Sequence, residues 1–134
     1  MTVHLKKLAV GISSIGELIQ RQKEIIDRYG KIIHFTRNRP QKTEDLLHNG
    51  SIYWVIKRLV KVRQRILGIK ELIRTDGKKS AGIILENKLI RVRQTPMKPF
   101  QGWRYYNIED VPPDIDKSDF SDDLEEELSK LGLY

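Results

Sequence analysis

The sequence contains no cysteine among its 134 residues, which excludes disulfide bonds and thiolate metal sites. It also lacks any apolar run near the roughly 18 residues that a membrane-spanning helix needs. The first residues, Met1–Val10, hold lysines and only a short apolar run, so we expect no signal peptide. These absences predict a cytoplasmic protein in a reducing compartment, without a membrane partner.

Motifs for catalysis or cofactor binding are also missing. The glycines are dispersed and form no phosphate-binding loop, and there is no Gly-x-Ser-x-Gly nucleophile elbow. His4, His34 and His48 lie far apart, without the close His-His or His-Glu spacing of a metal site. Asp114 and Asp116 fall in a predicted linker, where carboxylates are usually solvated. We therefore expect a non-enzymatic protein with no catalytic residues, no metal and no cofactor.

Positive charge is present in excess and is unevenly distributed. The net charge is +7, with 23 Lys and Arg against 8 Asp and Glu in residues 1–108, and 2 against 10 in residues 109–134. This division predicts an anionic partner for the basic body, such as nucleic acid or another polyanion. The acidic tail is predicted either to contact the basic face of the body or to remain solvated.

The pattern of elements predicts one basic α+β domain over residues 1–111 and an acidic linker and tail over residues 112–134. Ser14 and Gly30 have the character of the N-cap and C-cap of one helix, and Thr43 is the predicted N-cap of a second. We expect a curved, mostly antiparallel sheet of roughly five to seven strands, or a small barrel. The predicted strands are Val3–Val10, Lys31–Thr36, Ser51–Ile56, Leu59–Arg74 with a bulge at Gly68 and a turn at Asp76-Gly77, Ala81–Leu85 and Lys88–Gln94. In the tail, Leu124, Leu128 and Leu131 fall on one stripe of a possible helix over Asp122–Leu131.

Two predicted strands carry similar basic patterns, since Val62-Arg63-Gln64 recurs as Val92-Arg93-Gln94. Alternation places Lys61, Arg63 and Arg65 on one side of their strand, and Val60, Val62, Gln64 and Ile66 on the other. If the two strands share a sheet, their basic faces form a cationic plate that also contains Arg91 and Arg93. The alternative is a solvated outer face covered by long side chains.

Aromatic residues next to basic residues are the second signal. Tyr53-Trp54 precedes Lys57, and Trp103 is followed by Arg104 and Tyr105. An aromatic face beside a cation can stack a nucleic-acid base while the charge holds its phosphate. Trp54 has apolar neighbours and is expected to fill the core. Trp103 follows Gly102 in a proline-rich loop and is expected to contribute to a site.

Three separated blocks, Gly50–Lys57 (GSIYWVIK), Arg63–Ile66 (RQRI) and Phe100–Tyr105 (FQGWRY), resemble a bacterial family of uncharacterised proteins, a domain of unknown function. The resemblance covers about residues 1–115, so the acidic tail is expected to lie outside it. The order of elements, with the helix-glycine-strand passage Glu44–Ile56, also resembles PUA-like domains and their ASCH and EVE relatives. That resemblance implies a small curved barrel of a kind that often binds RNA.

The first hypothesis is a nucleic-acid-binding module, with RNA as the favoured ligand. Its predicted binding residues are Arg37, Arg39, Tyr53, Lys57, Arg63, Arg65, Arg91, Arg93, Trp103, Arg104 and Tyr105. One alternative is an enzyme or sensor for a small anion such as a nucleotide, with Tyr53, Lys57, Gln101 and Arg104 lining a pocket and Tyr53 as its acid–base group. Another alternative is a module that docks an acidic protein.

Overall fold

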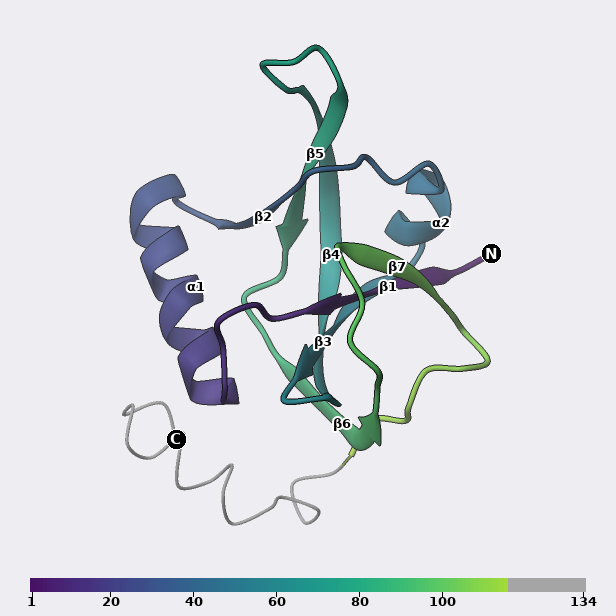
Figure 1. Cartoon of the computed structure of the whole chain (residues 1–134). Helices are drawn as coiled ribbons and strands as arrows, with labels where there is room; N and C mark the ends of the chain where they lie inside the picture. The colour runs from purple at the N-terminus through teal and green to yellow at the C-terminus, as the bar shows by residue number, and fades with distance from the viewer. Residues whose placement is uncertain (116–134) are drawn as a thin grey trace.

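A computed structural model describes residues 1–115, which form two helices and seven strands (Figure 1). The helices are α1 (Ile15–Tyr29) and α2 (Thr43–Leu47), and the strands are β1 (Val3–Leu8), β2 (Ile32–Thr36), β3 (Ser51–Ile56), β4 (Leu59–Ile73), β5 (Lys79–Leu85), β6 (Ile90–Pro96) and β7 (Trp103–Asn107). The strands form one sheet in the order β2-β5-β4-β3-β1-β7, and β6 pairs with β4. Only β1 and β3 pair in parallel within this described part of the chain. The predicted α+β class and mostly antiparallel sheet are confirmed.

The sheet is curved but does not close into a barrel. β4 is 15 residues long, and its register with its partners shifts between Val60 and Val62 and again between Ile66 and Gly68. Such bulges bend a strand and increase its twist. Within residues 1–115, β2 pairs with β5 alone and β7 with β1 alone, so the two ends of the sheet stay apart. The register shift between Ile66 and Gly68 confirms the bulge or bend predicted at Gly68. The barrel alternative is wrong, because the sheet stays open.

Helix α1 begins and ends where its caps predict. The Ser14 hydroxyl accepts a hydrogen bond from the Glu17 N–H at 3.1 Å, and Gly30 has the left-handed φ of 77° that favours glycine. Helix α2 differs from the prediction, because Lys42 rather than Thr43 is its N-cap and makes no side-chain capping bond. No helix within residues 1–115 combines the length and the apolar character that crossing a bilayer requires.

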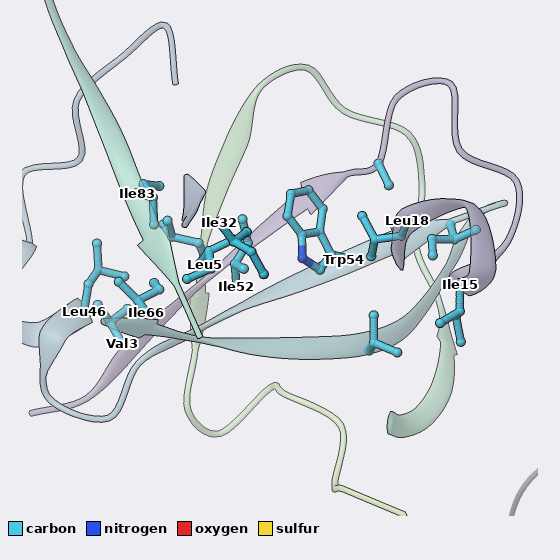
Figure 2. Close-up of a cluster of buried hydrophobic side chains, with 14 residues drawn as sticks. Val3, Leu5, Ile15, Leu18, Ile32, Leu46, Ile52, Trp54, Ile66 and Ile83 are labelled. Atoms are coloured by element: carbon cyan, nitrogen blue, oxygen red, sulfur yellow. The ribbon is translucent and has the colours of Figure 1, made fainter. Parts of the chain in front are cut away.

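The main core lies between α1 and one face of the sheet. Trp54 lies among the strand residues Leu5 and Ile52 and the helix residue Leu18 (Figure 2). Only 4% of Trp54 is exposed, which confirms its expected place in the core. A second, smaller core on the opposite face contains Tyr53, Val55, Val60, Val92 and Tyr106, with Met97, Phe100 and Val111 packed against it.

The segment after β7 crosses back to β6 and packs there. The Arg93 N–H donates to the Pro113 carbonyl at 2.9 Å, and the Ile115 N–H donates to the Arg91 carbonyl at 3.0 Å. Pro112 is buried. Residues 112–115, which the sequence assigned to a linker, are thus in contact with the sheet. The predicted tail helix, Asp122–Leu131, lies outside the described residues.

Candidate nucleic-acid interface

The predicted cationic plate does not form, although its two strands do pair. In the β4–β6 register Val62 lies opposite Arg91, and Arg63 lies opposite Ile90. Directly opposed residues share a face of the sheet and successive residues alternate, so Arg63 and Arg91 lie on opposite faces. Arg91 lies on the α1 side, beside Val62 of the main core. The expected plate is therefore wrong.

A bulge in β4 overturns a second expectation, that Val60 and Val62 share one side of their strand. Trp54 of β3 lies opposite Val62, but the next β3 residue, Val55, lies opposite Val60. Lys61 is thus the extra residue, and Val60 and Val62 point to different faces, which places Val60 in the second core and Val62 in the main core. The prediction that both valines share one side is wrong for this reason.

Arg63 and Arg65 make contacts within the domain. Arg63 donates from Nε and Nη2 to the two carboxylate oxygens of Asp114, at 2.7 and 2.8 Å, and from Nη1 to the Ser51 hydroxyl at 3.0 Å. The hydrogen bond to Arg63 holds the pKa of the Asp114 carboxyl below its usual value. Arg65 is exposed and donates to the Asn49 side chain at 3.0 Å. Asp114 is thus a structural partner of Arg63 rather than a solvated linker residue.

Arg39 also has a structural role. Its Nε donates to the Ser80 carbonyl at 3.1 Å and its Nη2 to the Leu72 carbonyl at 2.8 Å, which joins the loop after β2 to β4 and β5. Arg37 of the same loop is exposed, and so is Arg93 on β6. These two arginines remain accessible to a ligand.

Tyr53 is a core residue and is unsuited to acid–base chemistry near neutral pH. Only 3% of it is exposed, and its ring meets those of His4 and Tyr106 edge to face, at centroid distances of 5.2 and 5.3 Å. Burial raises the pKa of Tyr53 to about 12. Lys57 is exposed in the β3–β4 turn, and Gln101 is exposed in the β6–β7 connection. The alternative pocket therefore lacks the acid–base group proposed for it.

Residues from Trp103 onward form an edge strand, where the sequence predicted a loop for Trp103. β7 pairs with β1 so that Lys7 lies opposite Trp103, and Lys6 lies opposite Arg104. Alternation places Trp103 and Tyr105 on one face and Arg104 on the other. On each of these two faces a cation is in contact with an aromatic ring.

On the face of β7 that carries Arg104, the side chains of Lys6 and Arg104 contact aromatic rings. The Lys6 Nζ lies 5.0 Å from the centroid of Tyr106 and 5.7 Å from that of Phe100, and the Arg104 guanidinium lies 5.9 Å from Phe100. These distances are within the range of cation–π attraction. Phe100 is half-buried, and Arg104 is exposed.

The β3–β4 turn lies next to this group. The Met97 N–H donates to the Arg58 carbonyl at 2.8 Å, which ties the turn to the connection that carries Phe100. Lys57 and Arg58 have φ values of 50° and 65°, the left-handed conformation that a two-residue hairpin turn requires. The turn therefore adds exposed positive charge next to Met97, in the same connection as Phe100.

On the opposite face, which carries Trp103 and Tyr105, the loop after β2 forms hydrogen bonds with both aromatic residues. The Trp103 indole N–H donates to the Asn38 carbonyl at 2.9 Å. The Tyr105 hydroxyl accepts from the backbone N–H groups of Gln41 and Lys42, at 2.8 and 3.1 Å. The Lys42 Nζ lies 4.9 Å from the Tyr105 ring. We call the residues on the two faces together the β7 surface: Lys6, Lys42, Phe100, Trp103, Arg104 and Tyr105.

The sequence pattern pointed to Trp103, Arg104 and Tyr105 of this surface, but not to Lys6, Lys42 and Phe100. Lys6 and Arg104 are almost a hundred positions apart, and only the β1–β7 pairing brings them together. The aromatic and basic block Phe100-Gln101-Gly102-Trp103-Arg104 is the sequence signal that includes Phe100. Among residues 1–115, His, Asp and Glu side chains form no group of three or more that suits a metal ion.

The chain matches a protein family over residues 5–134, and that family is described as "Protein of unknown function (DUF1489)". No curated protein and no solved structure matches the chain. The match runs to Tyr134, so the expectation that the acidic tail lies outside the family is wrong. Because the match covers nearly the whole chain, this protein belongs to the DUF1489 family of proteins of unknown function.

Proposed function

We propose that this protein binds single-stranded nucleic acid, with RNA as the favoured ligand, through the β7 surface. Phe100 and Trp103 offer aromatic faces on which unpaired bases stack. Lys6, Lys42 and Arg104 contact the phosphates on either side of these bases. Stacking combined with backbone charge is the usual means of binding single strands with little sequence preference.

The observation that carries this proposal is the contact between cations and aromatic rings on both faces of one edge strand. The Lys6 Nζ lies 5.0 Å from the Tyr106 ring on one face, and the Lys42 Nζ lies 4.9 Å from the Tyr105 ring on the other. None of the ion pairs among residues 1–115 involves Lys6, Lys42 or Arg104. These charges are thus available to phosphates. Arg37 lies exposed on the loop that holds Trp103 and adds a further phosphate contact.

Fluorescence anisotropy with a labelled single-stranded RNA, measured over a range of salt concentrations, tests the proposal. Lys6→Gln/Arg104→Gln removes two phosphate contacts, so we expect weaker binding and a salt slope about 1.4 smaller, at roughly 0.7 for each contact. Lys31→Gln/Lys70→Gln is the matched control, because it removes the same charge from exposed positions away from β7. Phe100→Leu keeps an apolar side chain but loses the ring, and we expect it to bind about tenfold more weakly.

Two results would contradict the proposal. One is a wild-type protein that does not bind RNA even at low ionic strength. The other is an equal loss of affinity in the β7 variant and in its control, which would indicate a diffuse effect of net charge. A matched DNA oligonucleotide measured in parallel distinguishes a preference for RNA from general binding of single strands.

A second candidate function is the binding of a small anion, and a specific cavity favours it. A cavity of about 110 Å³ lies beneath α1 and is lined by Lys7, Arg21, His34 and Trp54 among others. The His34 Nε2 atom is buried and has no hydrogen-bond partner among residues 1–115. Burial, together with the smaller effect of the nearby Lys7, lowers the pKa of His34 to about 4. A carboxylate or phosphate group bound there would hydrogen-bond with Lys7 and His34.

Titration with inorganic phosphate or acetate, followed by NMR of the histidine side chains, tests this second function. We expect an anion in the cavity to shift the His34 signals and to raise the pKa of His34. His34→Gln should abolish binding measured by calorimetry. Shifts of the same size at exposed His48 and at His34 would indicate a general ionic effect and would exclude the site.

A further inference from the structure

A groove of about 340 Å³ lies between α1 and the β5–β6 connection, away from the β7 surface. Its apolar lining includes Ile19 and Ile26 of α1 and Leu89 of the connection. Its cations are Lys23, Lys88 and Arg91, and no carboxylate is among the residues that line it. The groove therefore suits an occupant with both apolar side chains and negative charge.

The C-terminal chain is led to the edge of this groove. Asp114 forms a β-bridge with Val92, and the Ile115 N–H donates to the carbonyl of Arg91 at 3.0 Å. The backbone of Arg91, a residue that lines the groove, thus holds the last described residue. The segment that follows begins beside the groove and needs no long passage to reach it.

The sequence of residues 116–134 has the complementary character. It contains seven Asp and Glu against two Lys. Leu124, Leu128 and Leu131 follow the i, i+4, i+7 spacing of peptides that place one apolar stripe in a groove. The family match includes this segment, extending to residue 134. The tail therefore lies within the region that the family match covers.

We propose that residues 116–134 dock in this groove of their own chain, with the three leucines on its apolar lining and the carboxylates beside Lys23 and Lys88. A chain of nine to thirteen residues, the separation of Ile115 from Leu124 and Leu128, spans roughly 15–22 Å when flexible, enough to cross the groove. Tethering gives the segment a local concentration in the millimolar range, so contacts of modest affinity are occupied. This docking is independent of nucleic-acid binding, because it uses another part of the surface.

Disulfide trapping tests the proposal in the full-length protein, because the chain contains no cysteine of its own. Ser129→Cys is combined in turn with Asn87→Cys at the groove, Gln101→Cys beside the β7 surface, and Thr75→Cys at the β4–β5 turn. All three body positions are exposed and uncharged, so the net charge is unchanged. We expect the Asn87 pair to close about tenfold faster than the others under mild oxidation. Because the body is folded and the tail starts at Ile115, beside the groove, proximity alone gives the Asn87 pair some advantage, which a charge reversal separates from docking.

A charge reversal identifies the groove as the cause. Lys23→Glu/Lys88→Glu should slow closure of the Asn87 pair severalfold, because the carboxylates of the tail lose their cationic partners. Lys31→Glu/Lys70→Glu, with the same net charge and cations outside the groove, should leave it fast. Fastest closure of the Gln101 pair would mean that the tail covers the β7 surface, and would overturn the proposal. Equal closure rates of the Asn87 pair in the two charge-reversed proteins would also overturn it, since they would mean that the tail does not dock in the groove. Neither result bears on RNA binding, because no RNA is present.

Discussion

Loss of the Asp114 carboxylate is expected to loosen the segment that crosses back to β6. The Arg63 guanidinium donates hydrogen bonds from two nitrogen atoms to this carboxylate, at 2.7 and 2.8 Å, and from the third to the Ser51 hydroxyl of β3 at 3.0 Å. The pair therefore links residue 114 to two adjacent strands. Asp114→Ala and Arg63→Ala each break this link, and the double variant completes a mutant cycle that isolates the interaction.

The exposure of the pair sets the size of the effect. Arg63 is 22% exposed and Asp114 48%, so solvent screens much of their attraction. Exposed ion pairs contribute roughly 0.2–1 kcal/mol, and the bidentate geometry places this pair at the upper end. We therefore expect a coupling free energy of about 1 kcal/mol at neutral pH.

Urea denaturation of the four proteins measures this coupling. The Arg74–Asp76 pair is the control, with a similar exposure of 23% and 42% but a single contact of 2.7 Å. Its two residues are already held together by the β4–β5 turn, so we expect a coupling of about 0.3 kcal/mol. A coupling for Arg63–Asp114 no larger than that of the control would refute the idea that this pair holds residues 111–115 to the sheet.

The coupling should also depend on pH in one direction. Arg63 holds the pKa of Asp114 below its usual value in the folded protein. The stabilisation is therefore complete above the ordinary aspartate pKa, near 3.9, and is lost as the pH falls through the lowered folded value. The coupling measured at neutral pH should shrink in strong acid.

Three further predictions concern the core. Gly50→Ala should lower the free energy of unfolding, measured by urea denaturation, by more than about 3 kcal/mol. Its Cβ would lie 2.6 Å from the Val3 carbonyl oxygen and closer still to that of Leu46. Gly77→Ala should lower it by about 1–2 kcal/mol, because Gly77 has a φ of 83° but open space around it. Gln64→Leu should lower the free energy of unfolding by about 2–3 kcal/mol in thermal melts, because Gln64 accepts hydrogen bonds from the Trp54 indole at 3.1 Å and from the Gln22 amide at 2.8 Å. The double variant Gln22→Leu/Gln64→Leu should lose less stability than the sum of the two single variants. The pKa of His34 is lowered from 6.5 to about 4 in the folded protein, so only the unfolded chain takes up a proton between these pH values. The free energy of unfolding should therefore fall by up to about 3 kcal/mol as the pH drops from 6.5 to 4. In His34→Gln this fall should be smaller.

Local features of the structure were predictable because their causes lie within a few residues. Ser14 and Gly30 bound α1 through hydrogen bonds to residues three or four positions away. The Asp76-Gly77 turn closes β4 onto β5, and Gly77 has the positive φ that this turn type needs. Trp54 lies in a strand whose residues are all buried, and the apolar and aromatic composition of that strand predicts this burial.

The faces of the sheet were decided only by the tertiary structure. Alternation along a strand has a period of two, so one extra residue at Lys61 reverses which side chains share a face. That single bulge separates Val60 from Val62, and the pairing of β6 places Arg91 on the opposite face from Arg63. A glycine marked the irregularity near Gly68 in the sequence, but no local pattern marks the bulge at Lys61.

The sequence by itself determined the α+β class, the bounds of α1 and the strongly basic character of the body, because composition, capping and strand propensity act locally. Only the tertiary structure decided which cations meet which rings. Lys6 joins Arg104 and Phe100 because β1, near the start of the chain, pairs with β7 near its end. Asp114 becomes the partner of Arg63 because its segment returns across the sheet to β6. Contacts between residues so distant in the chain depend on the packing of the whole domain, and no window of sequence contains them.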